Sequence, residues 1–253
     1  MHAALSIQTS RTWATSRVHQ TSKLDTLWGN GGIVVIAPHP DDEILGCGAL
    51  IAAMVAHNRP VWVMYMTDGG ASTPDLNDIA RAQLVQLRQN EAIAGLECLG
   101  VPPSAAIFVG APDGFLARSG DHLRNAKSKL DDLLHQGIIS SVLVTSSQDG
   151  HLDHKAACDF AFDAMSFWPD IKLFTYPVSS RIDAGSPADT SLLFPIIVDT
   201  RSFLIQKMAA LSCHTSQLIT DRSKPGFTLS EKLVEHMCTT PEYFLLEDLS
   251  YER

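Results

Sequence analysis

Short apolar runs alternate with longer mixed stretches along most of the chain. The runs have the length of buried strands, and the stretches between them carry apolar residues near helical spacing, as do Leu84, Leu87 and Leu96. Turn-forming or helix-stopping residues, such as Gly100 after the second stretch, separate the elements. The pattern predicts strands over residues 33–37, 61–66, 105–109, 141–145, 171–176 and 196–198, and helices over residues 42–57, 77–99, 121–136, 153–168, 201–213 and 229–238.

Strands that are separated by helices favour right-handed crossovers and a mostly parallel sheet. We therefore predict an α/β fold, with a single Rossmann-like domain whose mostly parallel sheet is flanked by helices and whose C-terminal part is less regular. Residues 179–191, rich in Ser, Asp, Gly and Pro, predict an excursion or a hairpin. Residues 1–30 predict a flexible or irregular segment. Residues 31–253 predict one domain, because no repeat, low-complexity tract or linker divides them.

Composition and charge exclude several classes of protein. The 253 residues, 45% of them hydrophobic and 19% charged, suffice for the full core of a soluble domain. A formal net charge of −9 disfavours a nucleic-acid-binding surface, and no apolar run approaches the roughly 20 residues of a membrane span. Five cysteines without a CxxC pair predict buried thiols in a reducing compartment. We expect a cytoplasmic protein without nucleic-acid partners; a homo-oligomer is compatible with the sequence.

Two groups of ionisable side chains follow predicted strands directly. Pro38-His39-Pro40-Asp41-Asp42-Glu43 follows the strand over 33–37, and Asp149-Gly150-His151-Leu152-Asp153-His154 follows the strand over 141–145. The first group repels itself unless a cation lies among its carboxylates, and imidazole together with carboxylate suits zinc. Because ligands gather at the carboxyl ends of parallel strands, we expect the two groups to meet.

Joined together, the two groups predict a mononuclear metal site. His39 and Asp42 reach one ion if the chain turns tightly at Pro40, and His154 supplies the third ligand. Three protein ligands and an open position are typical of catalytic zinc, whereas structural zinc sites use four ligands.

The remaining side chains of the two groups have catalytic interpretations. Asp41 lies close to the metal without binding it, where it can take a proton from metal-bound water. His151 is free to stabilise a developing oxyanion, and Asp153 to orient a histidine and raise its basicity.

Both motifs resemble those of the PIG-L/LmbE-like family of zinc-dependent N-acetylglucosaminyl deacetylases. The resemblance covers about residues 33–214, and the first motif is highly specific. Shorter elements stand in the same order: Thr67-Asp68-Gly69, Arg88-Gln89-Asn90-Glu91-Ala92, Pro112-Asp113-Gly114, Lys207 and His214-Thr215-Ser216-Gln217. One departure is Leu152, where the family usually has proline, but this side chain carries no chemistry.

The resemblance implies a role for seven residues. It implies zinc binding by His39, Asp42 and His154 and general-base catalysis by Asp41. It also implies that His151 stabilises the tetrahedral intermediate, and that Arg88 and Asp113 bind the sugar or neighbouring substrate groups. The implied function is zinc-dependent removal of the N-acetyl group from an N-acetylglucosamine-type sugar conjugate.

Other interpretations stay open at this point. One alternative is that the same site acts on a non-sugar N-acyl amine or a thiol conjugate, and iron(II) or another divalent ion is an alternative to zinc. A metal-free Rossmann-like binding module and metal-dependent phosphate chemistry are further alternatives, although a phosphate loop of the G-x-x-x-x-G-K-[ST] type is absent. Arg88 stands at helical spacing for a pair with Glu91, and Glu43 is placed to bond nearby backbone. For His214 three roles stay open: capping a helix, packing in the core or bordering the site.

Overall fold

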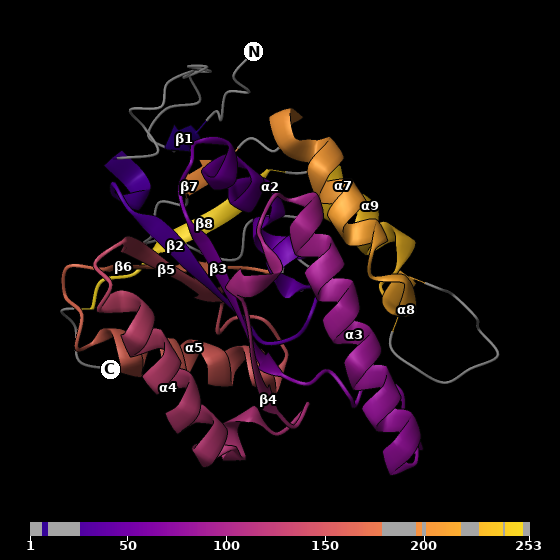
Figure 1. Ribbon diagram of the computed structural model, residues 1–253. Coiled ribbons are helices and arrows are strands. Elements are labelled where there is room, and N and C mark those ends of the chain that lie inside the picture. The colour runs from indigo at the N-terminus through magenta and orange to yellow at the C-terminus, as the bar shows by residue number, and fades with distance from the viewer. Residues whose placement is uncertain are drawn as a thin grey trace.

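The computed structural model describes residues 7–9, 26–178, 196–198, 201–218, 228–239 and 241–249 (Figure 1). The strands are β1 (Ile7–Thr9), β2 (Gly32–Ala37), β3 (Val61–Thr67), β4 (Ala106–Ala111), β5 (Ile139–Thr145), β6 (Lys172–Tyr176), β7 (Ile196–Val198) and β8 (Glu242–Leu246). The α-helices are α2 (Asp42–Ala56), α3 (Asp78–Cys98), α4 (Gly120–Leu134), α5 (Leu152–Met165), α7 (Leu204–Ser212), α8 (Thr215–Leu218) and α9 (Glu231–Thr239). Short 3₁₀ turns occupy η1 (Pro103–Ala105), η2 (Leu116–Arg118) and η3 (Arg201–Phe203).

The described strands form one sheet in the order β1-β7-β8-β6-β5-β2-β3-β4. The five strands from β6 to β4 pair in parallel, whereas β8, β7 and β1 continue the sheet through antiparallel pairs. From β2 the chain runs outward through β3 and β4, and then returns to the other side of β2 to form β5 and β6. The direction of winding therefore reverses between β2 and β5, which is where open α/β sheets form their ligand crevice.

Helices cover both faces of the sheet, as Figure 1 shows. Successive side chains of β2 point to opposite faces. Ile33 and Val35 belong to a core shared with α2, α3, α7 and α9, while Val34 and Ile36 belong to a core shared with α4 and α5. All six residues of β2 are buried, which explains why its sequence is apolar throughout and not alternating.

The predicted α/β fold with a mostly parallel sheet is confirmed, and every strand and helix predicted among the described residues overlaps an observed one. The predicted helix over 201–213 is divided into η3 and α7, because Phe203 leaves helical geometry at the junction with φ −123° and ψ 13°. Residues 179–191, with their predicted excursion or hairpin, lie outside the described residues.

Two strands of the sheet, β1 and β8, were not predicted from the sequence. Ile7–Thr9 form β1 inside the segment predicted to be irregular, and β8 lies in the C-terminal part, where only one helix was predicted. β8 joins the sheet by pairing with β6, and β1 joins it by pairing with β7, which also pairs with β8. Within the described part of the chain, no helix has both the length and the apolar character that a bilayer span requires.

Candidate metal centre and active site

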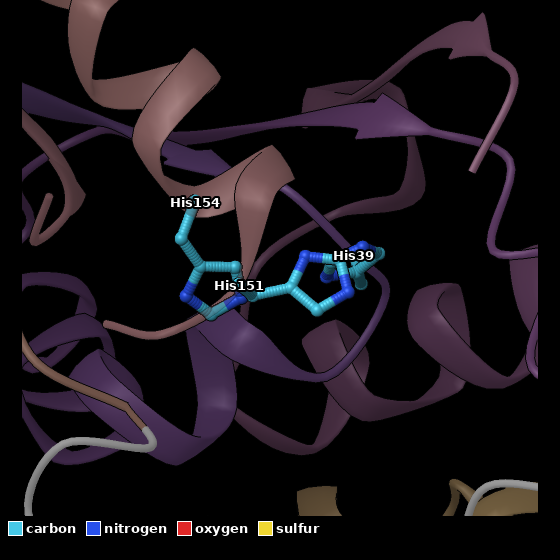
Figure 2. A group of neighbouring side chains, drawn as sticks. All are labelled: His39, His151 and His154. Atoms are coloured by element: carbon cyan, nitrogen blue, oxygen red, sulfur yellow. The ribbon is translucent and has the colours of Figure 1, made fainter. Parts of the chain in front are cut away.

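Loops from four neighbouring parallel strands meet at one edge of the sheet. His39 follows β2, Asp68 follows β3, Asp113 follows β4, and the second histidine motif follows β5. Figure 2 shows the rings of His39, His151 and His154 close together, with ring centroids 4.6 Å apart for His39 and His151 and 5.4 Å for His39 and His154. The two predicted groups of ionisable side chains are thus brought together at the switch point.

The chain turns sharply between β2 and α2. Asp41 has φ 143°, in the region that non-glycine residues avoid, at a cost of about 1–3 kcal/mol. The surrounding structure holds this turn: Arg88 Nη2 and Gln217 Nε2 each donate to the carbonyl of Pro40 at 3.1 Å. The His39 N–H donates to Asp42 Oδ2 at 2.9 Å. This is the tight turn that lets His39 and Asp42 face a common point.

One carboxylate oxygen lies between the two predicted histidine ligands. Asp42 Oδ2 is 3.2 Å from His39 Nδ1 and 3.3 Å from His154 Nε2. The far nitrogen of each ring faces other carboxylates: His154 Nδ1 is 3.0 Å from Asp149 Oδ2, and His39 Nε2 is 3.3 Å from Asp153 Oδ2. If each ring is neutral and donates its proton outward to those partners, as metal binding requires, an unprotonated nitrogen of each ring faces Asp42.

This arrangement fits a metal ion. Two imidazole lone pairs and a carboxylate cannot share one point unless a proton or a metal cation lies among them. Two nitrogens and one oxygen, each ring backed by an outer carboxylate, form the donor set typical of catalytic zinc. A ring nitrogen of His151 also lies within 4.8 Å of one from each of the other two histidines, among the described residues that could hold an ion.

Neighbouring carboxylates raise the pKa of both proposed ligand histidines, His39 and His154. Burial lowers the pKa of His39, but hydrogen bonds from its ring to Asp113, Asp153 and Asp42 outweigh this and raise it well above its usual value. Burial also lowers the pKa of His154, but the carboxylates of Asp42 and Asp149 outweigh this effect and raise the pKa to about 9. These carboxylates therefore favour positive charge at this point, either as protons on the two rings or as a metal ion between them.

The pKa values of the adjacent residues Asp41 and Asp42 shift in opposite directions. Burial and the charge of Asp42 raise the pKa of Asp41 to about 7. At Asp42 burial acts in the same direction, but His154 and His39 outweigh it and lower the pKa. Burial raises the pKa of Glu43 to about 8, although its carboxylate accepts from the Tyr65 hydroxyl at 2.8 Å and from the Asp41 N–H at 3.0 Å. Asp42 thus stays ionised, as a metal ligand requires, and the pKa of Asp41 lies in the range that suits a general base.

His151 lies on the solvent side of the centre. It is exposed, and its Nδ1 accepts a hydrogen bond from the Asp153 N–H at 3.2 Å, which leaves the ring proton on Nε2 in the neutral form. Partial burial and the positive charges of His39 and His154 lower its pKa. His151 can therefore donate a hydrogen bond from Nε2 toward a molecule that enters the site.

Two carboxylates orient the His39 ring. Asp153 faces Nε2 and accepts from the N–H groups of Gly114 at 2.7 Å and Leu116 at 3.1 Å, so its position is fixed from both sides. Asp113 Oδ1 also lies 3.3 Å from His39 Nε2, while its Oδ2 accepts from the Ala71 N–H at 3.0 Å. The expected orienting contact of Asp153 is made with His39, and Asp113 is placed beside the same ring.

Arg88 is buried and holds two loops of the site. Its Nη1 donates to the Gly69 carbonyl at 2.7 Å and its Nη2 to Pro40, while its Nε has no hydrogen-bond partner among the described residues. Gly69 has φ +66°, and a Cβ there would lie 2.7 Å from Arg88 Nη1, so both backbone and space require glycine. Glu91 instead accepts hydrogen bonds from Thr215 and Ser216, so the alternative pairing of Arg88 with Glu91 is wrong.

Two polar residues of the site were given no role from the sequence. Asp149 binds the outer nitrogen of His154, and Gln217 Nε2 donates to Asp41 Oδ2 in a short hydrogen bond. Gln217 Oε1 is in turn 2.9 Å from Nδ1 of His214, which is fully buried. Both residues stand within motifs that the sequence singled out, but the contact of Gln217 with Asp41 spans 176 residues, and no local pattern indicates it.

Comparisons with known proteins agree with this geometry. The family model described as "PIG-L: GlcNAc-PI de-N-acetylase" matches residues 34–165, more than half of the chain. A protein of Acidothermus cellulolyticus named 1D-myo-inositol 2-acetamido-2-deoxy-alpha-D-glucopyranoside deacetylase is 26% identical over 265 residues, covering 87% of this chain and 90% of that protein.

Solved structures share the fold. N,N'-diacetylchitobiose deacetylase from Pyrococcus horikoshii aligns with a TM-score of 0.63 and 20% identity, over 90% of this chain and 87% of that one. The 4-carboxy-2-hydroxymuconate hydratase from Pseudomonas putida aligns with a TM-score of 0.62 and 16% identity, over 88% and 97%. Since a hydratase and a deacetylase share this fold, the fold alone does not decide the reaction. The matched family range contains both histidine motifs of the centre, and the chain belongs to the PIG-L family.

Proposed function

We propose that this protein is a metal-dependent hydrolase that removes the N-acetyl group from an N-acetylglucosamine-type sugar conjugate. The observation that carries the proposal is the convergence of His39 Nδ1 and His154 Nε2 on Asp42 Oδ2, with Asp41 and His151 beside it. Membership of the PIG-L family supports a deacetylase, and the relative named for an acetamido-glucopyranoside of inositol supports the substrate class.

His39, Asp42 and His154 would hold the ion, and we propose zinc because nitrogen and carboxylate donors together suit it; iron(II) satisfies the same donor set. When bound, zinc polarises an amide carbonyl and lowers the pKa of a coordinated water toward about 7. Asp149 and Asp153 lie behind the two rings and would fix their orientation, so we regard them as positioning residues.

The protein's own side chains would then move the protons. The Asp41 carboxylate accepts a proton from the attacking water while the new carbon–oxygen bond forms. Its Oδ2 accepts a hydrogen bond from Gln217, which limits how the carboxylate can rotate. His151 donates from Nε2 to the developing oxyanion. The carbon–nitrogen bond breaks as the amine receives a proton from Asp41 or His151, and the products are acetate and a free amine.

Substrate contacts form the finer part of the proposal. Asp113 borders the His39 ring and is partly exposed, which suits a carboxylate that accepts hydrogen bonds from sugar hydroxyls. Arg88 is 3% exposed, and both terminal nitrogens of its guanidinium bond backbone carbonyls. We therefore propose that Arg88 contributes to substrate binding by holding the Gly69 and Pro40 loops. A cytoplasmic location and a homo-oligomer stay predictions.

The experiment that tests the proposal compares Asp41→Asn with wild type on two conjugates, the N-acetylglucosamine glycoside of inositol and diacetylchitobiose. Acetate release should fall by about 10²–10⁴-fold in the variant, the usual contribution of a general base, while zinc content by elemental analysis stays near one ion per chain. Asp121→Asn is the matched control, because Asp121 lies on α4 with its side chain 89% exposed, and it should keep wild-type turnover.

Other outcomes separate the alternatives. Near-normal acetate release by Asp41→Asn would exclude Asp41 as the base. The wild type would be an amidase that uses the same centre if it binds zinc and cleaves other N-acyl amines or thiol conjugates, but neither sugar conjugate. Protein that gains neither zinc nor activity on reconstitution is the metal-free binding module.

A further inference from the structure

Two thiols meet where α3 packs against α7. Cys98 is the last residue of α3 and Cys213 caps the C-terminus of α7, and their Sγ atoms lie 3.7 Å apart. Cys98 is exposed and Cys213 partly exposed, whereas Cys47, Cys158 and Cys238 are buried. The prediction of buried thiols is wrong for this pair, because both cysteines stand at helix ends that reach the surface.

We propose that Cys98 and Cys213 are an oxidation site, at which a low-molecular-weight disulfide such as oxidised glutathione converts the two thiols into an intramolecular disulfide. The sulfurs are already in van der Waals contact and must approach to about 2.05 Å. Each cysteine stands at a helix terminus, where the last turn adjusts most easily. The other three cysteines are buried and cannot compete for the oxidant.

The exchange proceeds in two balanced steps. The Cys98 thiolate attacks one sulfur of oxidised glutathione, which breaks that disulfide and releases one glutathione thiolate. Cys213 then attacks the Cys98 sulfur of the mixed disulfide and releases the second glutathione. The protein gives up two electrons and two protons, and the oxidant becomes two thiols. Burial and the neighbouring Cys98 raise the pKa of Cys213 to about 11, so the more exposed Cys98 reacts first.

The disulfide would fasten the contact that supports Gln217. Gly95 stands one turn before Cys98 on the same face of α3, and a Cβ there would lie 3.1 Å from His214 Nε2. His214 follows Cys213 directly, and its Nδ1 lies 2.9 Å from Gln217 Oε1. Oxidation therefore links α3 to the segment that carries His214 and Gln217, and closing so long a loop should raise the melting temperature.

The test uses the whole protein, incubated with oxidised glutathione and then denatured for thiol counting. Wild type should fall from five free thiols to three, peptide mapping should find Cys98 joined to Cys213, and dithiothreitol should restore five thiols. Cys98→Ser and Cys213→Ser should form no intramolecular bond, whereas Cys158→Ser, a matched control at a buried thiol, should still form it. Oxidised wild type should melt several degrees above the reduced protein.

Three results would overturn the proposal. They are retention of five thiols in excess oxidant, a product that stops at glutathione on Cys98, and a bond between two chains instead of within one. A disulfide that forms without raising the melting temperature would overturn the claim that it fastens α3 to the Gln217 segment.

Discussion

Replacing Lys207 by methionine tests a buried ion pair that joins the C-terminal part of the chain to the helix behind the metal motif. Lys207 Nζ lies 2.8 Å from Glu242 Oε1, and both side chains are 0% exposed. Lys207 also donates to the Leu45 carbonyl at 2.9 Å, while Glu242 accepts from the N–H groups of Ala49 at 2.8 Å and Leu50 at 2.9 Å.

These contacts engage the middle of α2. Leu45 and Ala49 are four residues apart, so their carbonyl and N–H are the two ends of one regular helical hydrogen bond. Lys207 donates to the Leu45 carbonyl, and Glu242 accepts from the Ala49 N–H. Gly48 makes room for the lysine side chain, because a Cβ at this position would lie 3.0 Å from Lys207 Cγ. The pair therefore supports the helix whose first turn carries Asp42.

The cost of the substitution follows from what is left behind. Methionine keeps most of the apolar stem but removes the ammonium, so Glu242 stays buried with two N–H donors and no cation. Breaking a buried pair by removing one partner lowers the free energy of unfolding by about 3–5 kcal/mol. Because the N–H groups of Ala49 and Leu50 still stabilise the Glu242 carboxylate, we expect a loss near the lower end, about 3 kcal/mol. A double variant, Lys207→Met with Glu242→Gln, removes both charges and should lose about 1–3 kcal/mol less than the sum of the two single variants.

Urea unfolding measures these differences. With a slope of about 3 kcal/mol per molar urea, the midpoint of Lys207→Met should fall by about 1 M without a change in slope. Lys155→Met is the matched control, because Lys155 pairs with Asp159 on the surface of α5 with 60% of its side chain exposed, and it should cost less than about 1 kcal/mol. A Lys207→Met variant within 1 kcal/mol of wild type, or a fully additive double variant, would refute this reasoning.

Three further substitutions probe the centre itself. Asp149→Asn should weaken zinc binding by about 10–100-fold, because it loses the carboxylate behind His154; competition with a chromogenic chelator measures this, and a change below threefold contradicts it. Gln217→Leu should lower kcat by about 10–100-fold with KM nearly unchanged, since it frees Asp41 to rotate; a raised KM at constant kcat would show that Gln217 binds substrate instead. His151→Ala should lower kcat by about 10²–10³-fold at unchanged zinc content; loss of zinc in this variant would make His151 a ligand.

The parallel part of the fold could be predicted because its strands are mostly apolar runs separated by helix-like stretches and turn residues. β2 is buried on both faces, so its pattern has a single interpretation. β8 could not be found this way: it begins with the buried Glu242, whose charge is compensated by Lys207 and by backbone of α2 far away in the sequence. A buried carboxylate at the start of a strand looks like a surface residue until its partners are known.

The meeting of the three proposed ligands could be predicted for a similar reason. His39 and Asp42 lie three residues apart, and His154 follows a neighbouring strand, so strand order alone brings them together. The residues that hold Asp41 could not be predicted, because Gln217 approaches from a helix of four residues after α7. Spacing along the sequence carries information about ligands on one turn, but not about a side chain that arrives from another layer.

Residues 34–165 and the residues that follow them contribute differently to the site. The range matched by the family model ends at residue 165 and contains every proposed ligand, the base and His151. Yet Lys207 and Glu242 support α2 from outside that range, and Gln217 holds both Asp41 and the Pro40 carbonyl. The positive φ of Asp41 is a strained conformation that persists only where its surroundings determine it. The less regular C-terminal part therefore shares with Arg88 the task of holding the motif in this geometry. A chain cut after α5 would retain the proposed ligands but lose the Gln217 contact that orients Asp41.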